Sequence, residues 1–195
     1  MNAMRIVRVC AAALVTALML GGCASAVRVY VNPDADMAFY KKIAVLSFSN
    51  VSAEAMAGPR VTRAFVTEML ITQRYQIVEP EDFSAVLFKV AGPPGNVGVY
   101  DPAKIKEAAA SIGATGVLRG GVSEYAMQRT DGGDVPLIAF DAELLDVATG
   151  NVVWRSSITR RGKGGMPFTG GSRSLGSLTQ DACQELVERL VKEKL

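Results

Sequence analysis

The N-terminal segment decides which part of this 195-residue chain can enter a folded domain. Residues 1–8 contain two arginines and no acidic residue, and an apolar run without charges follows from Val9 to Leu20. A helix that crosses a membrane needs about 20 apolar residues, so this run is too short for a permanent span. Basic residues, an apolar run and then small residues are typical of a secretory signal peptide. We therefore exclude residues 1–22 from the fold.

The residues Leu20-Gly21-Gly22-Cys23 that end this segment resemble the processing site of bacterial lipoproteins. Glycines let a peptidase approach the backbone, and the resemblance implies that Cys23 becomes the new N-terminus and carries acyl chains, palmitate among them. More than one chain gives stable membrane anchoring. The alternative is ordinary cleavage after Ala24-Ser25-Ala26, which would release a soluble protein and discard Cys23.

Removal of residues 1–22 also changes the charge balance. The whole chain has 21 basic and 19 acidic residues, and Arg5 and Arg8 leave with the signal peptide, so the remainder is close to neutral. A near-neutral chain without a basic run has no electrostatic footprint for nucleic acid, and we expect no nucleic-acid partner. The residues that remain are enough for one domain with a sizeable core.

The composition argues against an enzyme. The chain has no histidine, which excludes Ser-His-Asp and Cys-His catalysis and most zinc sites. After cleavage the cysteines are Cys23 and Cys183, so no disulfide framework is expected. Cys183 falls on the apolar side of a predicted helix, and we interpret it as a buried core residue rather than a reactive thiol. We expect no catalytic residue, no cofactor and no metal site.

Other polar motifs have structural interpretations. The acids around Pro80 fall where a helix N-terminus favours negative charge. The segment Gly162-Lys163-Gly164-Gly165 lacks the spacing of a phosphate-binding loop. Asp34-Ala35-Asp36 begins like a calcium loop but lacks its later glycine and glutamate. Trp154 lies in an alternating run and is expected to pack in the core. A hydrolase that uses carboxylates alone stays open as a weaker alternative.

Residue periodicity predicts the element order β-α-β-α-α-β-β-β-α. We expect a single α/β sandwich in which a mixed sheet ends in an antiparallel meander and carries helices on both faces. Residues 43–48 are predicted as the central strand because they are apolar on both sides. The other predicted strands cover 75–78, 116–125, 135–147 and 152–161, and the predicted helices cover 59–73, 80–89, 102–112 and 174 onwards.

The domain boundaries follow from these elements. Residues 1–22 are the signal peptide, residues 23–40 the lipidated N-terminus and tether, and residues 41–195 the folded domain. The alternation of Val27, Val29 and Val31 allows one edge strand within the tether. As a flexible coil the tether would reach roughly 20 to 25 Å. We therefore expect the domain to lie close to its membrane.

Three blocks of sequence resemble a family of envelope lipoproteins, the group of the curli secretion channel CsgG, the exopolysaccharide-export lipoprotein PelC and the synthase activator LpoB. The blocks are Lys42 to Phe48 with the helix and strand up to Glu79, Ile112 to Tyr125, and Ala142 to Trp154. Together they span most of the chain beyond the signal peptide. The resemblance implies the fold of the TolB N-terminal domain.

Segment lengths favour one branch of this family. Residues 129–134 and 162–173 are the candidate positions for pore-forming hairpins, and both are too short for strands of about 9 to 11 residues that cross a bilayer. The short tether disfavours an LpoB-like activator. The PelC-like arrangement fits best, and it implies a non-enzymatic lipoprotein that forms homo-oligomers, with a ring as one possibility.

The resemblance also implies a location and a role. Ala24 is not the aspartate that retains lipoproteins in the inner membrane, so we expect the periplasmic face of the outer membrane, with acyl chains on Cys23 as the anchor. The implied role is a scaffold in a cell-envelope export or biogenesis complex with a protein partner that the sequence does not name. The alternatives are a periplasmic module that binds a ligand or peptide at the loop from Gly92 to Tyr100, and an activator of an envelope synthase.

Overall fold

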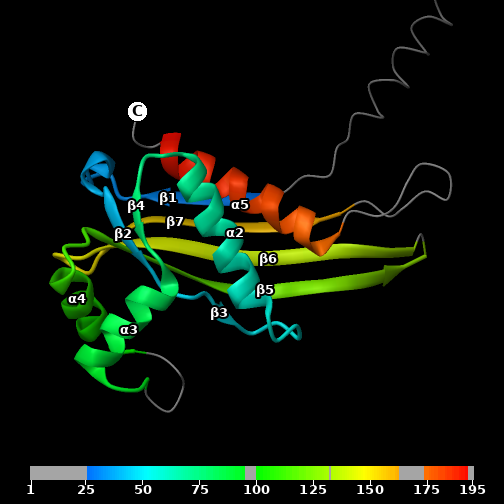
Figure 1. Cartoon of the computed structure of the whole chain (residues 1–195). Coiled ribbons are helices and arrows are strands. Elements are labelled where there is room, and N and C mark those ends of the chain that lie inside the picture. The colour runs from blue at the N-terminus through cyan, green and yellow to red at the C-terminus, as the bar shows by residue number, and fades with distance from the viewer. Residues whose placement is uncertain (1–25, 95–99, 132, 163–173, 193–195) are drawn as a thin grey trace, which may run out of the picture.

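A computed structural model describes residues 26–94, 100–131, 133–162 and 174–192 (Figure 1). Leaving out β1, the short η1 helix and β3, the order of elements is the predicted one. The elements are β1 Ala26–Val31, η1 Met37–Phe39, β2 Lys42–Val45, β3 Ser49–Asn50, α2 Ala57–Ile71, β4 Gln76–Val78, α3 Pro80–Ala91, α4 Pro102–Ser111, β5 Gly116–Thr130, β6 Gly133–Asp146, β7 Val152–Arg161 and α5 Leu175–Lys192.

Seven strands in the described residues form one open mixed sheet. Its order is β1-β7-β6-β5-β2-β4, and β3 pairs with β5. The strands β5, β6 and β7 form the predicted antiparallel meander, while β2 runs parallel to both β4 and β5. The prediction of β2 as the central strand is wrong, because β2 is second from the β4 edge. The side chains from Ile43 to Val45 are fully buried, so burial on both faces identifies a covered strand without fixing its position in the sheet.

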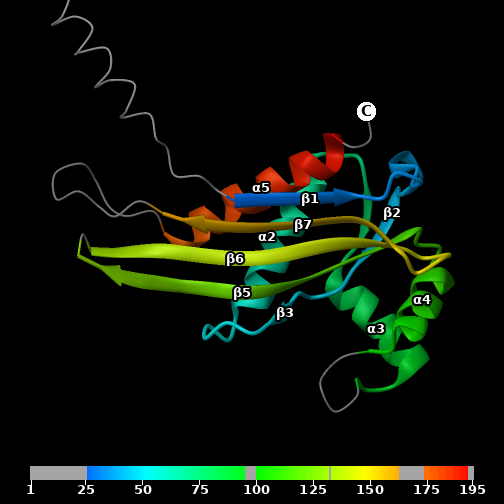
Figure 2. The same ribbon diagram turned by 180° about the vertical axis from the view of Figure 1, so that it is seen from behind.

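Helices cover the two faces of the sheet unequally. Along β2, Ile43 and Val45 join the core under α2 and α5, whereas Ala44 joins a second core under α3 and α4. The same alternation separates Leu118 from Val117 on β5. Helices α2 and α5 lie along one face, which we call the helical face, and α3 and α4 cover one end of the opposite face, which we call the open face (Figures 1 and 2).

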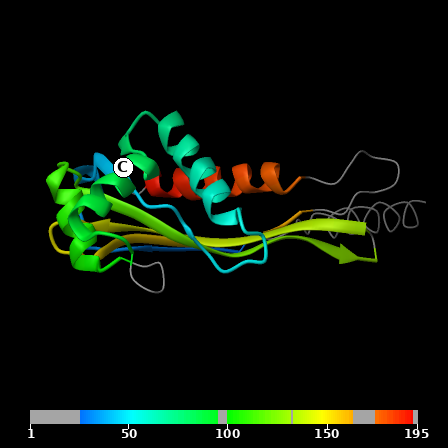
Figure 3. The same cartoon turned by 60° about the horizontal axis from the view of Figure 1, so that its bottom comes forward.

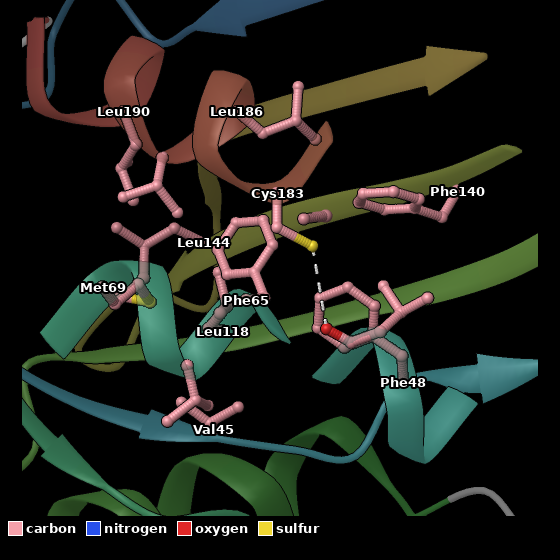
Figure 4. Close-up of a cluster of buried hydrophobic side chains, with 14 of the residues drawn as sticks. Val45, Phe48, Phe65, Met69, Leu118, Phe140, Leu144, Cys183, Leu186 and Leu190 are labelled. Atoms are coloured by element: carbon pink, nitrogen blue, oxygen red, sulfur yellow. Dashed lines mark hydrogen bonds between the residues drawn. The ribbon is translucent and has the colours of Figure 1, made fainter. Parts of the chain in front are cut away.

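The core under α2 and α5 is aromatic and aliphatic. The rings of Phe48 and Phe65 lie 5.7 Å apart between centroids, and Leu186 and Leu190 of α5 pack in the same cluster (Figure 4). Cys183 is fully buried there, and its thiol donates a hydrogen bond of 3.8 Å to the carbonyl of Val61. Burial raises the pKa of the Cys183 thiol far above its usual value. The predictions that Cys183 and Trp154 are core residues are confirmed.

The segment expected to be a flexible tether is folded over its described part. Strand β1 pairs with β7 over its whole length, from Ala26 to Val31, and is the edge strand that the valine alternation allows. Beyond β1, Asp36 caps the η1 helix through the backbone N–H of Ala38 at 2.9 Å, and Met37 and Tyr40 are buried. Burial of the Met37 and Tyr40 side chains in the core stabilises the folded segment relative to a solvated coil. The folded domain therefore includes residues 26–40.

Helix α4, Pro102–Ser111, has the predicted boundaries. The Asp101 carboxylate accepts a hydrogen bond of 2.8 Å from the backbone N–H of Ala103, and Pro102 is the first helical residue. Gly113 follows the helix with φ of 67°, a left-handed conformation that glycine adopts without strain. The chain then enters β5 at Gly116. The boundaries of helices α3 and α5 also agree with the predicted ones within a few residues.

The β5–β6 hairpin is longer than predicted. Pairing continues past Tyr125 to the pair Thr130 and Gly133, so strand residues extend into the expected turn over residues 129–134. The hairpin extends beyond the ends of α2 and α5 as a narrow arm (Figures 1 and 3). We define residues 124–130 and 133–137 as the hairpin arm. No helix in the described parts of the chain is long and apolar enough to cross a membrane.

Candidate interaction surfaces

The residue predicted to carry lipid lies outside the described part of the chain. Cys23 precedes β1, and the glycine-rich segments at 95–99 and 163–173 are not described either. The lipid site therefore stays a prediction from the sequence. It is separated from Ala26, the first residue of β1, by residues 24 and 25 alone.

The acidic residues around Pro80 occupy the start of α3. Glu79 is the residue before the helix, and Glu81 and Asp82 lie in its first turn, where the helix dipole favours negative charge. Among the described residues, no group of acidic, cysteine or histidine side chains is arranged to bind a metal ion. Asp36 caps a helix, as described above. These carboxylates have structural roles in the described geometry.

Charged side chains form a ladder across the open face. Arg119 on β5 and Glu143 on β6 are direct cross-strand partners, and their side chains form an ion pair of 2.6 Å. Arg155 on β7 extends the ladder to Glu143 at 3.5 Å and to Asp141 at 3.4 Å. The two arginines balance the two acids, so the ladder has no net charge. Glu143 is the most buried of the four, with its side chain 9% exposed.

A cleft of about 450 Å³ lies where the open face meets α3 and α4. The charged ladder supplies Arg119, Glu143 and Asp141 to one side, and Tyr100 lies at its border. The remaining lining residues are small or apolar, namely Leu46, Ser47, Ser49, Ser84, Ile105, Gly120 and Gly121. Hydroxyl groups, one aromatic ring and carboxylates that are each paired with an arginine suit a neutral polar ligand better than a strongly charged one. The predicted ligand loop thus contributes Tyr100 to a real cleft.

A buried polar contact joins the start of β2 to the end of β6. The Tyr40 hydroxyl donates to the Asp146 carboxylate at 3.0 Å, and Asp146 also accepts from the backbone N–H of Thr149 at 2.6 Å and from its hydroxyl at 2.8 Å. Partial burial opposes ionisation of Asp146, but these hydrogen bonds outweigh it and hold the pKa of Asp146 below its usual value. Burial, with the hydrogen bond to Asp146, raises the pKa of Tyr40 to about 12. No motif in the sequence indicates this pair.

A second groove, of about 500 Å³, runs between the edge strand β1 and α5. Its apolar wall is Val29, which is 36% exposed. Its polar wall consists of α5 side chains, namely Asp181, Gln184, Glu185, Glu188, Arg189 and Lys192. Glu185 is already engaged by Arg160 and Arg189, whereas Glu188 is exposed and accepts a hydrogen bond from Gln184. Arg160 follows Thr159, the partner of Ala26, and binds Glu185, so the half of α5 that carries Asp181 and Glu185 lies toward the start of β1.

No protein-family model matches this chain, and no curated protein matches it by sequence. Solved structures do. The PelC dodecamer from Paraburkholderia phytofirmans aligns with a TM-score of 0.60 and 23% identity over 86% of this chain and 97% of that chain. Lipoprotein GNA1162 from Neisseria meningitidis aligns with a TM-score of 0.54 and 18% identity over 76% and 99%.

A third structure, the hypothetical protein CT253 from Chlamydia trachomatis, aligns with a TM-score of 0.51 and 10% identity over 77% of this chain and 95% of that chain. In each case nearly the whole of the other chain is covered, so the likeness extends over a complete domain. At these identities the alignments establish architecture. The chain therefore has the mixed α/β fold of PelC and lipoprotein GNA1162.

Proposed function

We propose that this protein is a non-enzymatic lipoprotein on the periplasmic face of the outer membrane, where copies assemble into a scaffold for a cell-envelope export or biogenesis complex. The observation that carries this proposal is the fold, which is shared with PelC across 97% of that protein. PelC forms a dodecamer. The lipoprotein-like sequence ending at Cys23 supports the membrane location.

The folded N-terminus sharpens how such a lipoprotein would sit. Because β1 begins at Ala26, the covalent chain between Cys23 and the sheet can span at most about 10 Å. A lipidated Cys23 would hold the start of β1 against the membrane surface. Every copy would then have a similar orientation, which favours assembly in the membrane plane because it raises the local concentration of copies.

The absence of a long tether bears on the synthase-activator alternative. An activator that meets a partner across the periplasm needs reach, and residues 26–40 are taken up by the fold. The proposal is therefore an assembly that works at the outer membrane itself.

Cell fractionation and native mass together test the proposal. We expect the full chain to sediment with outer membranes and the Cys23→Ala variant to be released. In detergent, the membrane-extracted protein should have the mass of several copies. Cys23→Ser is a matched control for the thiol, and its release would have to equal that of Cys23→Ala. Retention of both variants in the outer membrane, or a monomeric mass at all concentrations, contradicts the proposal.

A second candidate function has its own observation, the cleft bordered by Tyr100. A binding module would use this cleft for a neutral, hydroxyl-rich ligand such as an oligosaccharide, which hydroxyl groups can bind and an aromatic ring can stack on. The test is chemical-shift mapping with neutral oligosaccharides in the wild type and in Tyr100→Ala. Shifts at Ser84 and Gly121 that vanish in the variant favour the module, and unchanged spectra reject it.

A further inference from the structure

We propose that copies of this chain join head to tail by pairing the hairpin arm of one copy with strand β1 of the next. The contact would extend one sheet into the next along two open strand edges. This inference rests on the self-assembly in the proposed function and names the surfaces that carry it. Four observations support it, from backbone edges, strand direction, side-chain faces and charge.

The first open edge belongs to β1. The backbone N–H of Asn32 donates to the Val153 carbonyl at 2.9 Å, and bonded and non-bonded residues alternate along an antiparallel strand. The backbone groups of Val27, Val29 and Val31 therefore point away from β7. In the described residues no further strand lies on that side of β1. An edge without proline, bulge or inward charge is a template for pairing.

The second open edge belongs to the distal part of β5. Pro136 is the partner of Met127 on β6, and its carbonyl accepts from the backbone N–H of Gly162 at 2.7 Å, on the side of β7. Met127 and Pro136 are therefore a non-bonded pair, and the alternation of the ladder directs the backbone groups of Met127 and Arg129 away from β6. Strand β3 pairs with β5 only at Gly121 and Val122, well before this point. Among the described elements, no strand lies beside Met127 and Arg129 on the side away from β6, and both side chains are exposed.

The directions of the two edges agree. Strands β5, β6, β7 and β1 are successively antiparallel, so β1 runs opposite to β5 within one copy. A second copy placed beside the first in the same orientation presents β5 antiparallel to β1. The sheet then continues with the hydrogen-bond pattern it already has.

The side chains also match. Val29 lies on the helical face of β1, because its neighbours Val27 and Val31 pack against the core under α2 and α5. Met127 lies on the same face of β5, two residues beyond the buried Tyr125. Both are partly exposed, Val29 by 36% and Met127 by 43%. Pairing Met127 opposite Val29 covers two apolar side chains that the single copy leaves in water.

Charge fixes the register. With Met127 opposite Val29, Arg129 lies opposite Val27, toward the start of β1. Helix α5 runs in the same direction as β1 (Figure 2), and the ion pair of Glu185 with Arg160 places the half of α5 that carries Asp181 beside this end. Arg129 of one copy therefore lies beside the end of the next copy's groove that carries the carboxylates of Asp181 and Glu185. A register shifted by two residues would lose either the apolar or the charged match.

The two edges lie on opposite sides of the sheet, so the contact uses different surfaces on the two copies. Such a heterologous contact leaves both end copies with an unused edge and propagates until it closes. The contact forms a ring where the rotation between copies closes, and otherwise an open filament. The proposal thus predicts oligomers larger than dimers.

Disulfide trapping in envelope membranes tests the pairing. The full chain carrying Val29→Cys and Met127→Cys is oxidised and resolved without reductant. Directly opposed residues in a bonded antiparallel pair have Cα atoms about 5.5 Å apart, within disulfide range. We expect a ladder of dimers, trimers and larger species. The native Cys183 is fully buried and does not compete.

The matched control carries Val29→Cys with Gln128→Cys. Gln128 is the next residue along β5, and its side chain lies on the other face, so the control should cross-link at least about tenfold less. Equal cross-linking of both pairs overturns the register. Dimers from Val29→Cys alone, without larger species, indicate a symmetric contact and overturn the head-to-tail arrangement. Absent cross-links in a protein of oligomeric native mass reject this inference and leave the proposed function standing, whereas a monomeric native mass rejects both.

A charge exchange provides an independent measurement. Arg129→Glu should lower the fraction of oligomer about tenfold, because it places a further carboxylate beside those of Asp181 and Glu185. Arg129→Lys keeps the charge and should assemble nearly normally. Adding Asp181→Lys to Arg129→Glu should restore assembly. Restoration by the double variant supports the contact, and an Arg129→Glu chain that assembles like the wild type contradicts it. Thermal unfolding of each variant confirms that the chains are folded.

Discussion

The two faces of the sheet use the same strands in different ways. On the helical face, alternate residues of β5, β6 and β7 pack against α2 and α5, and side chains such as Leu118, Leu144 and Ile158 are almost fully buried. On the open face, Val117 and Leu145 pack in the core under α3 and α4, and the charged residues Arg119 and Glu143 follow them along β5 and β6. The same sheet thus buries a core on its helical face and exposes charged side chains to solvent on its open face.

The difference separates stability from interaction. Burial of apolar side chains provides most of the free energy of folding, so the helical face should determine stability. Ion pairs exposed to water contribute little, so the open face is free to serve ligand or partner binding. Substitutions on the two faces therefore have unequal expected effects, which measurements of unfolding can rank.

The largest effect is expected at the centre of the helical face. Phe65 is fully buried and contacts the ring of Phe48. Phe65→Ala removes an aromatic side chain and leaves a cavity, and it should lower the free energy of unfolding by about 4 kcal/mol. Denaturant unfolding of the purified chain measures this. Phe88→Ala is the control, because Phe88 is 57% exposed on α3 and should change stability far less. Similar losses in both variants would contradict the ranking.

A smaller loss of stability is expected at Gly120, where β5 lies close to β6 and to the ring of Phe48. A Cβ at Gly120 would lie 2.2 Å from the carbonyl oxygen of Asp141 and 2.7 Å from the ring of Phe48. The backbone atom has no room to move, so Gly120→Ala should cost about 3 kcal/mol through overpacking. Gly121→Ala is the matched control, because its Cβ would meet the movable Ser49 hydroxyl at 2.9 Å. Equal losses would mean that the Phe48 contact is looser than described.

The third effect depends on pH. Because the folded-state pKa of Asp146 is depressed, its stabilising contribution is complete above the unfolded-state pKa of about 4 and disappears as the pH falls through the folded-state pKa. Asp146→Asn should lower stability by about 2 kcal/mol at neutral pH. The difference from the wild type should shrink below about pH 4. Unfolding curves from pH 3 to 7 measure this, and a difference independent of pH would contradict the role of the charge.

Tyr40→Phe checks the same contact from its other partner. It removes one of the hydrogen bonds that hold the Asp146 carboxylate and keeps the ring that packs against the core. Its effect at neutral pH should be smaller than that of Asp146→Asn, because the hydrogen bonds from Thr149 remain. A larger effect would mean that ring packing has changed as well.

The sequence predicted the helices and strands better than it predicted which of them lie side by side in the fold. Asp101, Pro102 and Gly113 fix the ends of a helix by local chemistry, and those boundaries are confirmed. The position of β2 in the sheet depends on parallel partners far along the chain, which periodicity does not encode. The valine alternation allows an edge strand within the tether but does not name its partner. Strand β1 is stabilised by β7, more than a hundred residues later.

The candidate surfaces were predicted in part. Tyr100 belongs to a loop that the sequence singled out, but the charged ladder needs the β5–β6–β7 register before Arg119, Glu143 and Arg155 can be brought together. The hairpin arm was missed because Gln128, Arg129 and Thr130 have the polarity of a turn. Exposed strand residues and turn residues share a composition, and only cross-strand pairing separates them.

The smallest effect is expected on the open face, and one strand supplies both members of the test. Arg155 is 56% exposed and forms ion pairs of 3.4 and 3.5 Å, so Arg155→Gln should change the free energy of unfolding by less than about 1 kcal/mol. Ile158, three residues later on the helical face, is 1% exposed, and Ile158→Ala should cost about 3 kcal/mol. If Arg155→Gln instead costs as much as Ile158→Ala, and more at high protein concentration than at low, then association must bury the ladder, because a loss that grows with concentration belongs to a contact between copies. That result would assign the open face to contacts between copies rather than to ligand binding.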